Sequence, residues 1–191
     1  GNAAAFGANA QAVGEYSVAV GADSIAAGEM SAAFGGGASA DGEGALATGA
    51  LASASGQEAV ASGYFATANG TGATALGAES VADGDKTTAV GYQANATGAQ
   101  SVANGFSATA DNRGTTAVGS LSTAAGDLAT AVGYGATAIG DYGTAVGLQA
   151  EASGSSATAL GEFSIASGIE STAVGGSAYN GLISAEAVGT N

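Results

Sequence analysis

The chain has 191 residues, of which 51 are alanine and 35 are glycine, and its formal net charge is −14. It contains no Cys, His, Pro or Trp, which excludes disulfide scaffolds, Cys/His zinc sites, collagen and any mechanism that needs imidazole or thiolate. Sixteen carboxylates against two cations repel nucleic-acid phosphates and anionic lipids. No stretch approaches the roughly 18 to 20 apolar residues that span a bilayer. We therefore predict no enzyme, no cofactor or metal, no nucleic-acid partner and no direct membrane insertion.

Glycine recurs with a period of seven. Every seventh residue from Gly7 to Gly189 is glycine, except at Asn112 and Leu182. We letter each heptad a to g, with this glycine at g. Position e is alanine in 26 of 27 heptads, and position c is alanine, serine or threonine in 26 of 27. Few large aliphatic residues and a high charge are typical of disorder, but this regularity predicts a folded repeat protein.

The heptads predict strands. A coiled coil needs bulky residues at two positions of each heptad, and a glycine in every second turn would cost about 1 kcal/mol relative to alanine. In residues 16–21 small side chains at c and e alternate with larger ones at d and f, which is the period of a β-strand. Glycine at g reaches positive φ in the following bend, and Asn112 is the non-glycine residue type that best tolerates that region.

The face formed by c, e and g carries none of the 18 charged residues, whereas 11 of the 16 carboxylates lie at a or b. Only Gly, Ala, Ser and Thr occupy this face, apart from Asn112, Asn180 and Leu182. This pattern predicts a very narrow interior between two strands, so that two heptads form one coil of 14 residues.

On every second heptad, a large apolar residue occupies f, or occupies d where f is Thr48, Ser62 or Asn104. This series, the apolar stripe, consists of Phe6, Val20, Phe34, Leu46, Val60, Leu76, Val90, Val102, Val118, Val132, Val146, Leu160, Val174 and Val188. In the intervening heptads, only five of 13 carry an aliphatic at d or f, namely Val13, Ile25, Val81, Ile139 and Ile165. One strand of each coil is therefore expected to face a dry environment and the other to face water.

The apolar stripe predicts self-association. Ordering a 14-residue coil costs roughly 14 to 28 kcal/mol, whereas one buried Val or Leu returns about 1.5 to 3 kcal/mol. In water, the stripe would also exceed the apolar patches of ordinary monomers. We expect it to pack against copies of itself around an axis.

The repeats resemble the head repeats of trimeric autotransporter adhesins of the YadA-like type. The resemblance rests on units such as 17–21 (SVAVG), 101–105 (SVANG) and 171–175 (STAVG), and it covers essentially all of residues 1–191. It implies an all-β fold, a left-handed parallel β-roll (solenoid) of 14-residue coils that is homotrimeric, with the apolar stripe as the trimer interface. It also implies a single repeat domain over 1–191 of about 13.5 coils. A junction to a neck or stalk is expected near 176–191, where the heptad pattern is irregular at 179–182.

By the same resemblance, the chain is a non-catalytic adhesin head on the bacterial outer membrane. Its expected partners are extracellular-matrix proteins, host cells or abiotic surfaces, bound through multivalent contacts. The family's collagen-associated unit has Asn at b before Ser-Val-Ala-Ile-Gly, whereas b is Tyr16, Gln100 or Glu170 in the units of this chain. The resemblance therefore does not predict collagen binding.

Exposed aromatic residues are common anchors in interfaces. At a and b the chain has Tyr16, Tyr64, Phe65, Tyr92, Phe106, Tyr134, Tyr142 and Phe163. Our candidates for ligand binding are Tyr16, Ser17, Val18, Tyr92, Tyr134 and Tyr142. The alternative, which we favour for the aromatic set, is that these side chains cover the edges of the roll between subunits.

Two carboxylate pairs could offer oxygen ligands to Ca²⁺, Asp83 with Asp85 and Asp41 with Glu43. Neither has an EF-hand or nonapeptide pattern, so a solvated surface is the better interpretation. Around Asn112, where the glycine is missing and Arg113 follows, we expect a local adjustment of the loop.

A rival function comes from threonine, which occupies d in six successive heptads from Thr109 to Thr144. Such a column could order water in an ice-binding β-solenoid. Ice-binding faces usually present paired threonine columns on one flat side, whereas this column alternates between the two strands of each coil. A polysaccharide-cleaving solenoid enzyme is the third candidate, and the chain has no clustered catalytic constellation for it.

Overall fold

The computed structural model describes residues 2–176 and 186–187. The chain divides into two compact units, Gly1–Ala99 and Gln100–Asn191, called unit 1 and unit 2. The expectation of a single domain over 1–191 stays a prediction. In both units the described residues form strands and turns, without any helix, so none of them belongs to an apolar helix long enough to cross a membrane.

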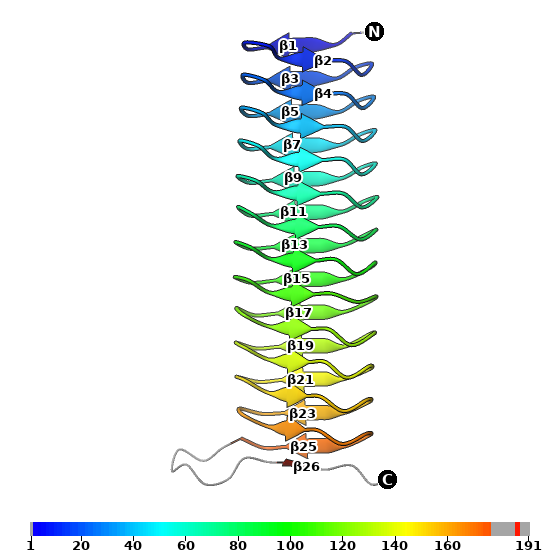
Figure 1. The fold of residues 1–191 in the computed structure, drawn as a ribbon, viewed down its shortest axis with the longest axis vertical. Helices are drawn as coiled ribbons and strands as arrows, with labels where there is room; N and C mark the ends of the chain where they lie inside the picture. Colours follow the sequence, from blue (N-terminus) through cyan, green and yellow to red (C-terminus); the bar gives the residue numbers. More distant parts are fainter. Residues whose placement is uncertain (1, 177–185, 188–191) are drawn as a thin grey trace. The chain divides into compact units, whose positions relative to one another are not determined.

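Each 14-residue coil contributes one strand to each of two parallel sheets, so the all-β parallel solenoid predicted from the sequence is confirmed. Sheet A holds the three-residue strands that carry d, e and f. Sheet B holds the two-residue strands that carry d and e. In Figure 1 the two sheets of each unit lie back to back, with turns on both sides.

In unit 1, the sheet A strands are β1 (Ala4–Phe6), β3 (Val18–Val20), β5 (Ala32–Phe34), β7 (Leu46–Thr48), β9 (Val60–Ser62), β11 (Thr74–Leu76) and β13 (Thr88–Val90). Its sheet B strands are β2 (Gln11–Ala12), β4 (Ile25–Ala26), β6 (Ser39–Ala40), β8 (Ser53–Ala54), β10 (Thr67–Ala68), β12 (Val81–Ala82) and β14 (Asn95–Ala96).

In unit 2, sheet A consists of β15 (Val102–Asn104), β17 (Thr116–Val118), β19 (Thr130–Val132), β21 (Thr144–Val146), β23 (Thr158–Leu160) and β25 (Thr172–Val174). Sheet B consists of β16 (Thr109–Ala110), β18 (Thr123–Ala124), β20 (Thr137–Ala138), β22 (Glu151–Ala152), β24 (Ile165–Ala166) and β26 (Glu186–Ala187).

Residues 14 apart pair in register along each sheet, for example Val118 with Val132 and Val132 with Val146. The pairing changes at the C-terminal end of unit 2, where Glu186 of β26 pairs with Ile165 of β24, an offset of 21 residues. The junction expected near 176–191 stays a prediction, because the irregular heptad at 179–182 and the stripe residue Val188 lie outside the described residues.

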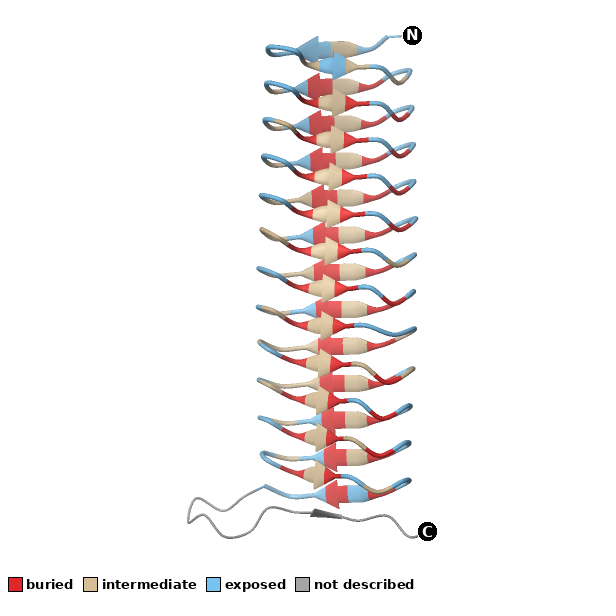
Figure 2. Ribbon diagram, viewed as in Figure 1, coloured by how far each residue is buried: buried red, intermediate tan, exposed pale blue. Residues whose placement is uncertain are grey.

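The interior contains only small residues: mainly alanine, with glycine, serine and threonine. Ala75 of β11 and Ala82 of β12 are both 0% exposed, and Figure 2 shows buried residues in the strands with exposed residues at the turns. Where position c is serine or threonine, the hydroxyl can donate to the carbonyl of its own turn, as Ser17 Oγ does to Gly14 O at 2.7 Å and Thr87 Oγ1 to Gly84 O at 2.7 Å. These hydrogen bonds satisfy most of the buried hydroxyls in so thin a core, whereas Ser31, Ser101 and Ser171 Oγ are buried without a hydrogen-bond partner.

Positive φ falls mainly at a position that the sequence did not indicate. Each turn is closed by the N–H of c, which donates to the carbonyl of g, as Ser24 does to Gly21 at 3.3 Å. Every b position from Asn9 to Glu170 is left-handed, and 19 of these residues are not glycine. The b N–H donates to the a carbonyl of the preceding coil, as Asp23 does to Ala8 at 2.8 Å. This stacking of the turns holds non-glycine residues in a conformation that costs roughly 1 to 2 kcal/mol each.

The glycines at g serve two purposes. After sheet A strands they have φ between 123° and 146°, a region that other residues rarely adopt. After sheet B strands no positive φ occurs in the described glycines, but a Cβ on Gly42 would lie 1.9 Å from the carbonyl oxygen of Gly56 in the next coil. Close approach of the coils therefore excludes side chains there.

Asn112 belongs to the second of these glycine series, so the explanation from positive φ was wrong for this residue. Asn112 is exposed, and its side-chain amide donates to the carbonyl of Ala125 in the next coil. The local adjustment expected around 111–113 therefore includes a side-chain contact between coils.

Candidate functional surfaces

Each unit presents four outer surfaces. Two are the outward faces of sheet A and sheet B, formed by positions d and f. The other two are edges formed by positions a and b of the turns. The T1 edge comprises the turns that follow sheet A strands, such as 7–10 and 133–136, and the T2 edge comprises the turns that follow sheet B strands, such as 14–17 and 140–143.

The outward face of sheet A carries the apolar stripe through all of its described members. Val20, Phe34, Leu76, Val146 and Leu160 are 37–39% exposed in the isolated chain, whereas Phe6 and Val174, at the ends, are 64% and 67% exposed. Leu46, Val60, Val90, Val102, Val118 and Val132 are half-buried. The register pairs stripe residues of successive coils where they share a heptad position, as Leu76 with Val90 and Val132 with Val146. Where the stripe shifts between f and d, it does not, because Phe34 pairs with Thr48 and Val102 with Thr116.

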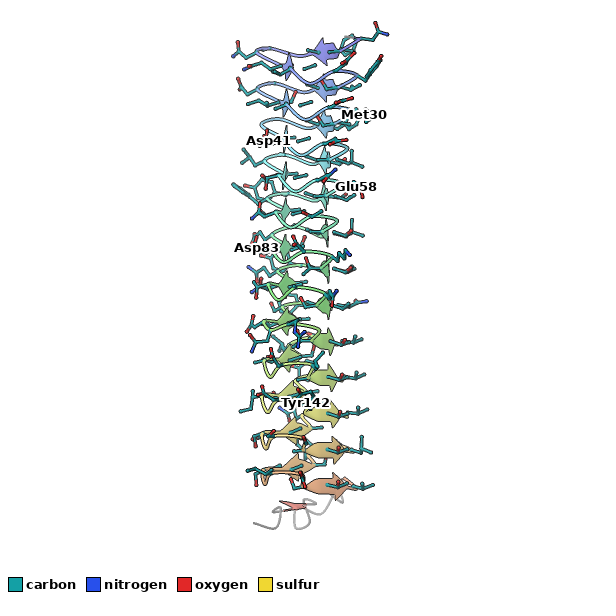
Figure 3. All side chains as sticks on the ribbon, turned by 90° about the vertical axis from the view of Figure 1, so that its right-hand side faces the viewer. Met30, Asp41, Glu58, Asp83 and Tyr142 are labelled. Carbon is teal, nitrogen blue, oxygen red and sulfur yellow. The ribbon has the colours of Figure 1, made fainter. Side chains whose placement is uncertain are left out.

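The outward face of sheet B is mostly polar. In unit 1, the hydroxyl of Ser55 donates to Asn69 Oδ1 at 2.8 Å, and the Asn69 amide donates to Asp83. Ser39 donates to Asp41 at 3.1 Å. Figure 3 shows Asp41 and Asp83 on the same side of unit 1, away from sheet A. This face can offer hydrogen bonds and negative charge to a ligand.

The T2 edge is rich in carboxylates. In unit 1 its a and b positions hold Glu15, Glu29, Glu43, Glu58 and Asp85, together with Lys86. In unit 2 they hold Asp127, Asp141 and Glu170, together with Arg113. Two of these carboxylates accept a backbone N–H of the preceding coil: Asp141 Oδ1 accepts from Asp127 at 2.9 Å, and Asp85 Oδ1 accepts from Thr71 at 2.9 Å.

The T1 edge is apolar over much of its length. In unit 1 it presents Leu51, Tyr64, Phe65 and Tyr92, and in unit 2 Phe106, Leu121, Tyr134, Leu148 and Phe163, all between 37% and 52% exposed. The rings of Tyr64 and Phe65 make an edge-to-face contact, with centroids 4.5 Å apart. Of the a and b positions here, only Asp23 and Glu79 in unit 1 and Glu162 in unit 2 carry charge.

Tyr92 lies against Glu79 of the preceding coil. Its hydroxyl donates to Glu79 Oε1 at 3.3 Å, and Gln93 Nε2 donates to Glu79 Oε2 at 2.7 Å. The negative charge of Glu79 raises the pKa of the Tyr92 phenol above its ordinary value of 10.0, with smaller contributions from lost hydration and from the hydrogen bond. The phenol therefore stays protonated and able to donate at neutral pH.

The ligand candidates from the sequence do not form one site. Ser17 is 0% exposed and donates to Gly14, so its proposed contact with an external ligand is ruled out by its position inside the roll. Val18 is half-buried on the outward face of sheet A. Tyr16 and Tyr142 lie on the T2 edge, whereas Tyr92 and Tyr134 lie on the T1 edge. The leucines of the T1 edge were not singled out, although sorting a and b by alternate heptads would have found them.

No group of three or more His, Cys, Asp or Glu side chains that could hold a metal ion occurs in the described residues. Asp83 and Asp85 are instead engaged separately, Asp83 with the Asn69 amide and Asp85 with the backbone N–H of Thr71. The threonines of the predicted column divide between sheets, with Thr109, Thr123 and Thr137 in sheet B and Thr116, Thr130 and Thr144 in sheet A. No single flat face carries all six.

The YadA head domain repeat, a family model that spans two copies of the repeat, matches residues 1–24, 26–52, 54–80, 82–108, 96–122, 110–136, 124–150 and 152–178. These matches cover nearly all of residues 1–178 with the 14-residue spacing of the coils. No curated protein matches the chain.

Proposed function

The chain belongs to the YadA head repeat family, a family of surface-exposed, non-enzymatic adhesins, and from this premise we propose that it is the head of a homotrimeric bacterial adhesin. The resemblance identified from the heptads alone is thereby confirmed. In the proposed assembly, three left-handed rolls stand side by side on the outer membrane and attach the cell to extracellular-matrix proteins, host cells or surfaces.

The main support for the proposed trimer is the apolar stripe on the outward face of sheet A. Its large side chains lie on one face, and five of them remain 37–39% exposed in the isolated chain. Three copies around an axis would remove all three stripes from water at once. Burial of a Val or Leu side chain contributes about 1.5 to 3 kcal/mol, so many coils together stabilise the assembly.

The acidic surfaces support adhesion to basic ligands. The charge of −14 per chain gives −42 for three chains, and much of it lies on the T2 edge and on sheet B. Basic patches on matrix or cell-surface proteins fit this charge, and Tyr16 and Tyr142 on the T2 edge are 54% and 61% exposed. Weak contacts repeated over three chains and many molecules bind through avidity.

The assembly is tested by light scattering on a size-exclusion column, with circular dichroism on the same peak. We expect a β-rich species near 52 kDa, three times the chain mass of 17.4 kDa. If the chain is monomeric, it should be fused to a trimerising coiled coil and its stripe probed as described below. A stripe that stays solvent-accessible in the fused trimer would contradict the proposed interface.

Adhesion is tested with the trimer on immobilised matrix proteins at about 50 mM and about 500 mM salt, because screening weakens contacts between exposed charges. Binding should fall as salt rises. Equal binding at both concentrations would contradict the electrostatic part of the proposal. Absence of binding to matrix proteins, to cells and to abiotic surfaces alike would contradict adhesion itself.

A further inference from the structure

We propose that the T1 edge is not an adhesive surface but is covered by a neighbouring copy of the same chain, which leaves the T2 edge and sheet B for ligands. This inference rests on the proposed trimer and goes beyond the apolar stripe. It assigns each edge of the roll a separate role, with the T1 edge inside the assembly and the acidic T2 edge outside.

The T1 edge is continuous with the stripe. Most stripe residues occupy f, the last residue of a sheet A strand, and the T1 turn begins at the next residue. Only the glycine at g separates Val132 from Tyr134, for instance. The outward apolar surface of sheet A therefore meets the T1 side through position f, whereas the T2 side adjoins position d, where only Leu46, Val60 and Val102 belong to the stripe.

Phe, Tyr and Leu do not occur together at f and at the following T1 position a. Where f is a bulky Phe6, Phe34, Leu76 or Leu160, the next a position is Ala8, Gly36, Ala78 or Glu162. Where a is a bulky Tyr64, Tyr92, Phe106, Tyr134 or Leu148, the preceding f is Ser62, Val90, Asn104, Val132 or Val146. No described coil has Phe, Tyr or Leu at both positions. Such compensation is expected where both positions fill one closely packed interface.

The charges are sorted in the same way. At positions a and b in unit 1, the T1 edge carries two charged residues and the T2 edge six; in unit 2 the numbers are one and four. Asp23 and Glu79 on the T1 edge accept hydrogen bonds from neutral partners, Asn9 and Gln93. Because every copy is strongly acidic, a contact between copies requires an edge that is nearly free of carboxylates.

Two leucines in equivalent positions allow the two edges to be compared by mutation. Leu121 on the T1 edge and Leu128 on the T2 edge both occupy position b in unit 2, with exposures of 43% and 44% and φ values of 59° and 56°. A substitution therefore has the same exposure and backbone setting at both sites. They differ in the edge on which they lie.

The first experiment measures self-association of the Leu121→Asp and Leu128→Asp variants by sedimentation equilibrium. Both add one carboxylate at an exposed position, so both should keep the β-rich spectrum of the parent chain. We expect Leu121→Asp to weaken the trimer by about 100-fold or more, because it places a charge in a packed interface. Leu128→Asp should leave the trimer unchanged. Equal association of the two variants would overturn the inference.

The second experiment is independent of any loss of stability and uses the absence of native cysteine. Single variants Leu121→Cys, Leu128→Cys and Val146→Cys are made in the coiled-coil fusion, and the rate of reaction with a maleimide is compared with that of a small thiol. We expect slow labelling at 121 and at 146, in the stripe, and fast labelling at 128.

The stripe variant distinguishes the two proposals. Protection at 146 with fast labelling at 121 would overturn the role of the T1 edge and leave the trimer standing. Fast labelling at both positions would contradict the trimer itself, and with it this inference. Slow labelling at 128 as well as at 121 would also overturn the inference, because the two edges would then not differ.

Discussion

The two halves of one coil share their inside and differ on their outside. In the coil that contains β11 and β12, Ala75 and Ala82 are both 0% exposed, and both lie in parallel ladders with partners 14 residues away. On the outside, Leu76 of sheet A is apolar, whereas its counterpart Asp83, which follows β12, accepts a hydrogen bond from Asn69. The interior thus determines the coil, and the outward positions determine what each face can contact.

The largest expected effect comes from disrupting the alanine interior that the two halves of the coil share. Ala75→Leu and Ala82→Leu each insert three carbon atoms into an interior that holds mainly alanine, and overpacking a core costs typically 1–3 kcal/mol or more. Both variants should lose a comparable part of their thermal stability, followed by circular dichroism. The outward substitution Thr74→Leu serves as the control and should not unfold the chain. A large difference between the two alanine variants would contradict a common interior.

The next prediction concerns two glycines of one turn. A Cβ at Gly42 would lie 1.9 Å from the backbone oxygen of Gly56, whereas at Gly44 the nearest atom is Cγ of Glu58 at 3.8 Å. Gly42→Ala should therefore separate adjacent coils and destabilise the chain strongly. Gly44→Ala should cost about 1 kcal/mol, the expense of a left-handed alanine. Chemical denaturation checks both, and similar losses would argue against close approach as the reason for glycine at position 42.

A third pair tests the difference between the faces. Leu76→Asp places a carboxylate in the stripe, whereas Val81→Asp places one on sheet B in the same coil. The first should shift the mass from near 52 kDa towards 17.4 kDa at micromolar concentration, because burying an unpaired charge is unfavourable. The second should not. Loss of the trimer in both variants would show that sheet B also takes part in assembly.

The smallest expected effect is a change in the pKa of the Tyr92 phenol. Glu79→Gln removes the charge that raises the pKa of Tyr92, so this phenol should titrate closer to its ordinary value of 10.0 in the variant. In the parent chain the folded state holds the phenolic proton more tightly than the unfolded state. This contribution to stability is complete below about pH 10 and is lost as pH rises through the folded pKa.

Absorbance near 295 nm, with Tyr92→Phe to identify the step, measures the shift. An unchanged titration in Glu79→Gln would mean that Glu79 does not interact with the phenol in solution.

Much of the fold could be predicted because the same residue pattern recurs in each heptad. Alanine at e and glycine at g over 27 heptads indicated the narrow interior, the strands and the 14-residue coil before any coordinates. The stripe residues could be placed on one face because d and f are two residues apart in a strand. The described stripe residues all lie on the outward side of sheet A, as predicted.

Other features depended on contacts between coils. The left-handed b positions, such as Met30 and Leu128, are unfavourable for a side chain by local rules, and the hydrogen bond that their backbone N–H donates to the preceding coil makes them possible. Ser17 was named as a ligand candidate although position c belongs to the interior face predicted from the sequence, and it lies inside the roll. The sequence already contains the difference in charge and apolar residues between the T1 and T2 turns. It could be interpreted only once the structure had assigned the two sets of turns to opposite edges.

The sequence by itself determined the coil, because a strict period leaves few ways to hide alanine and expose charge. Only the tertiary structure decided why each glycine is required, which residues take left-handed conformations and which side chains share an edge. Those properties arise from contacts between residues 14 positions apart, which form only when the coils stack. The conformational preferences within a single heptad therefore cannot predict them.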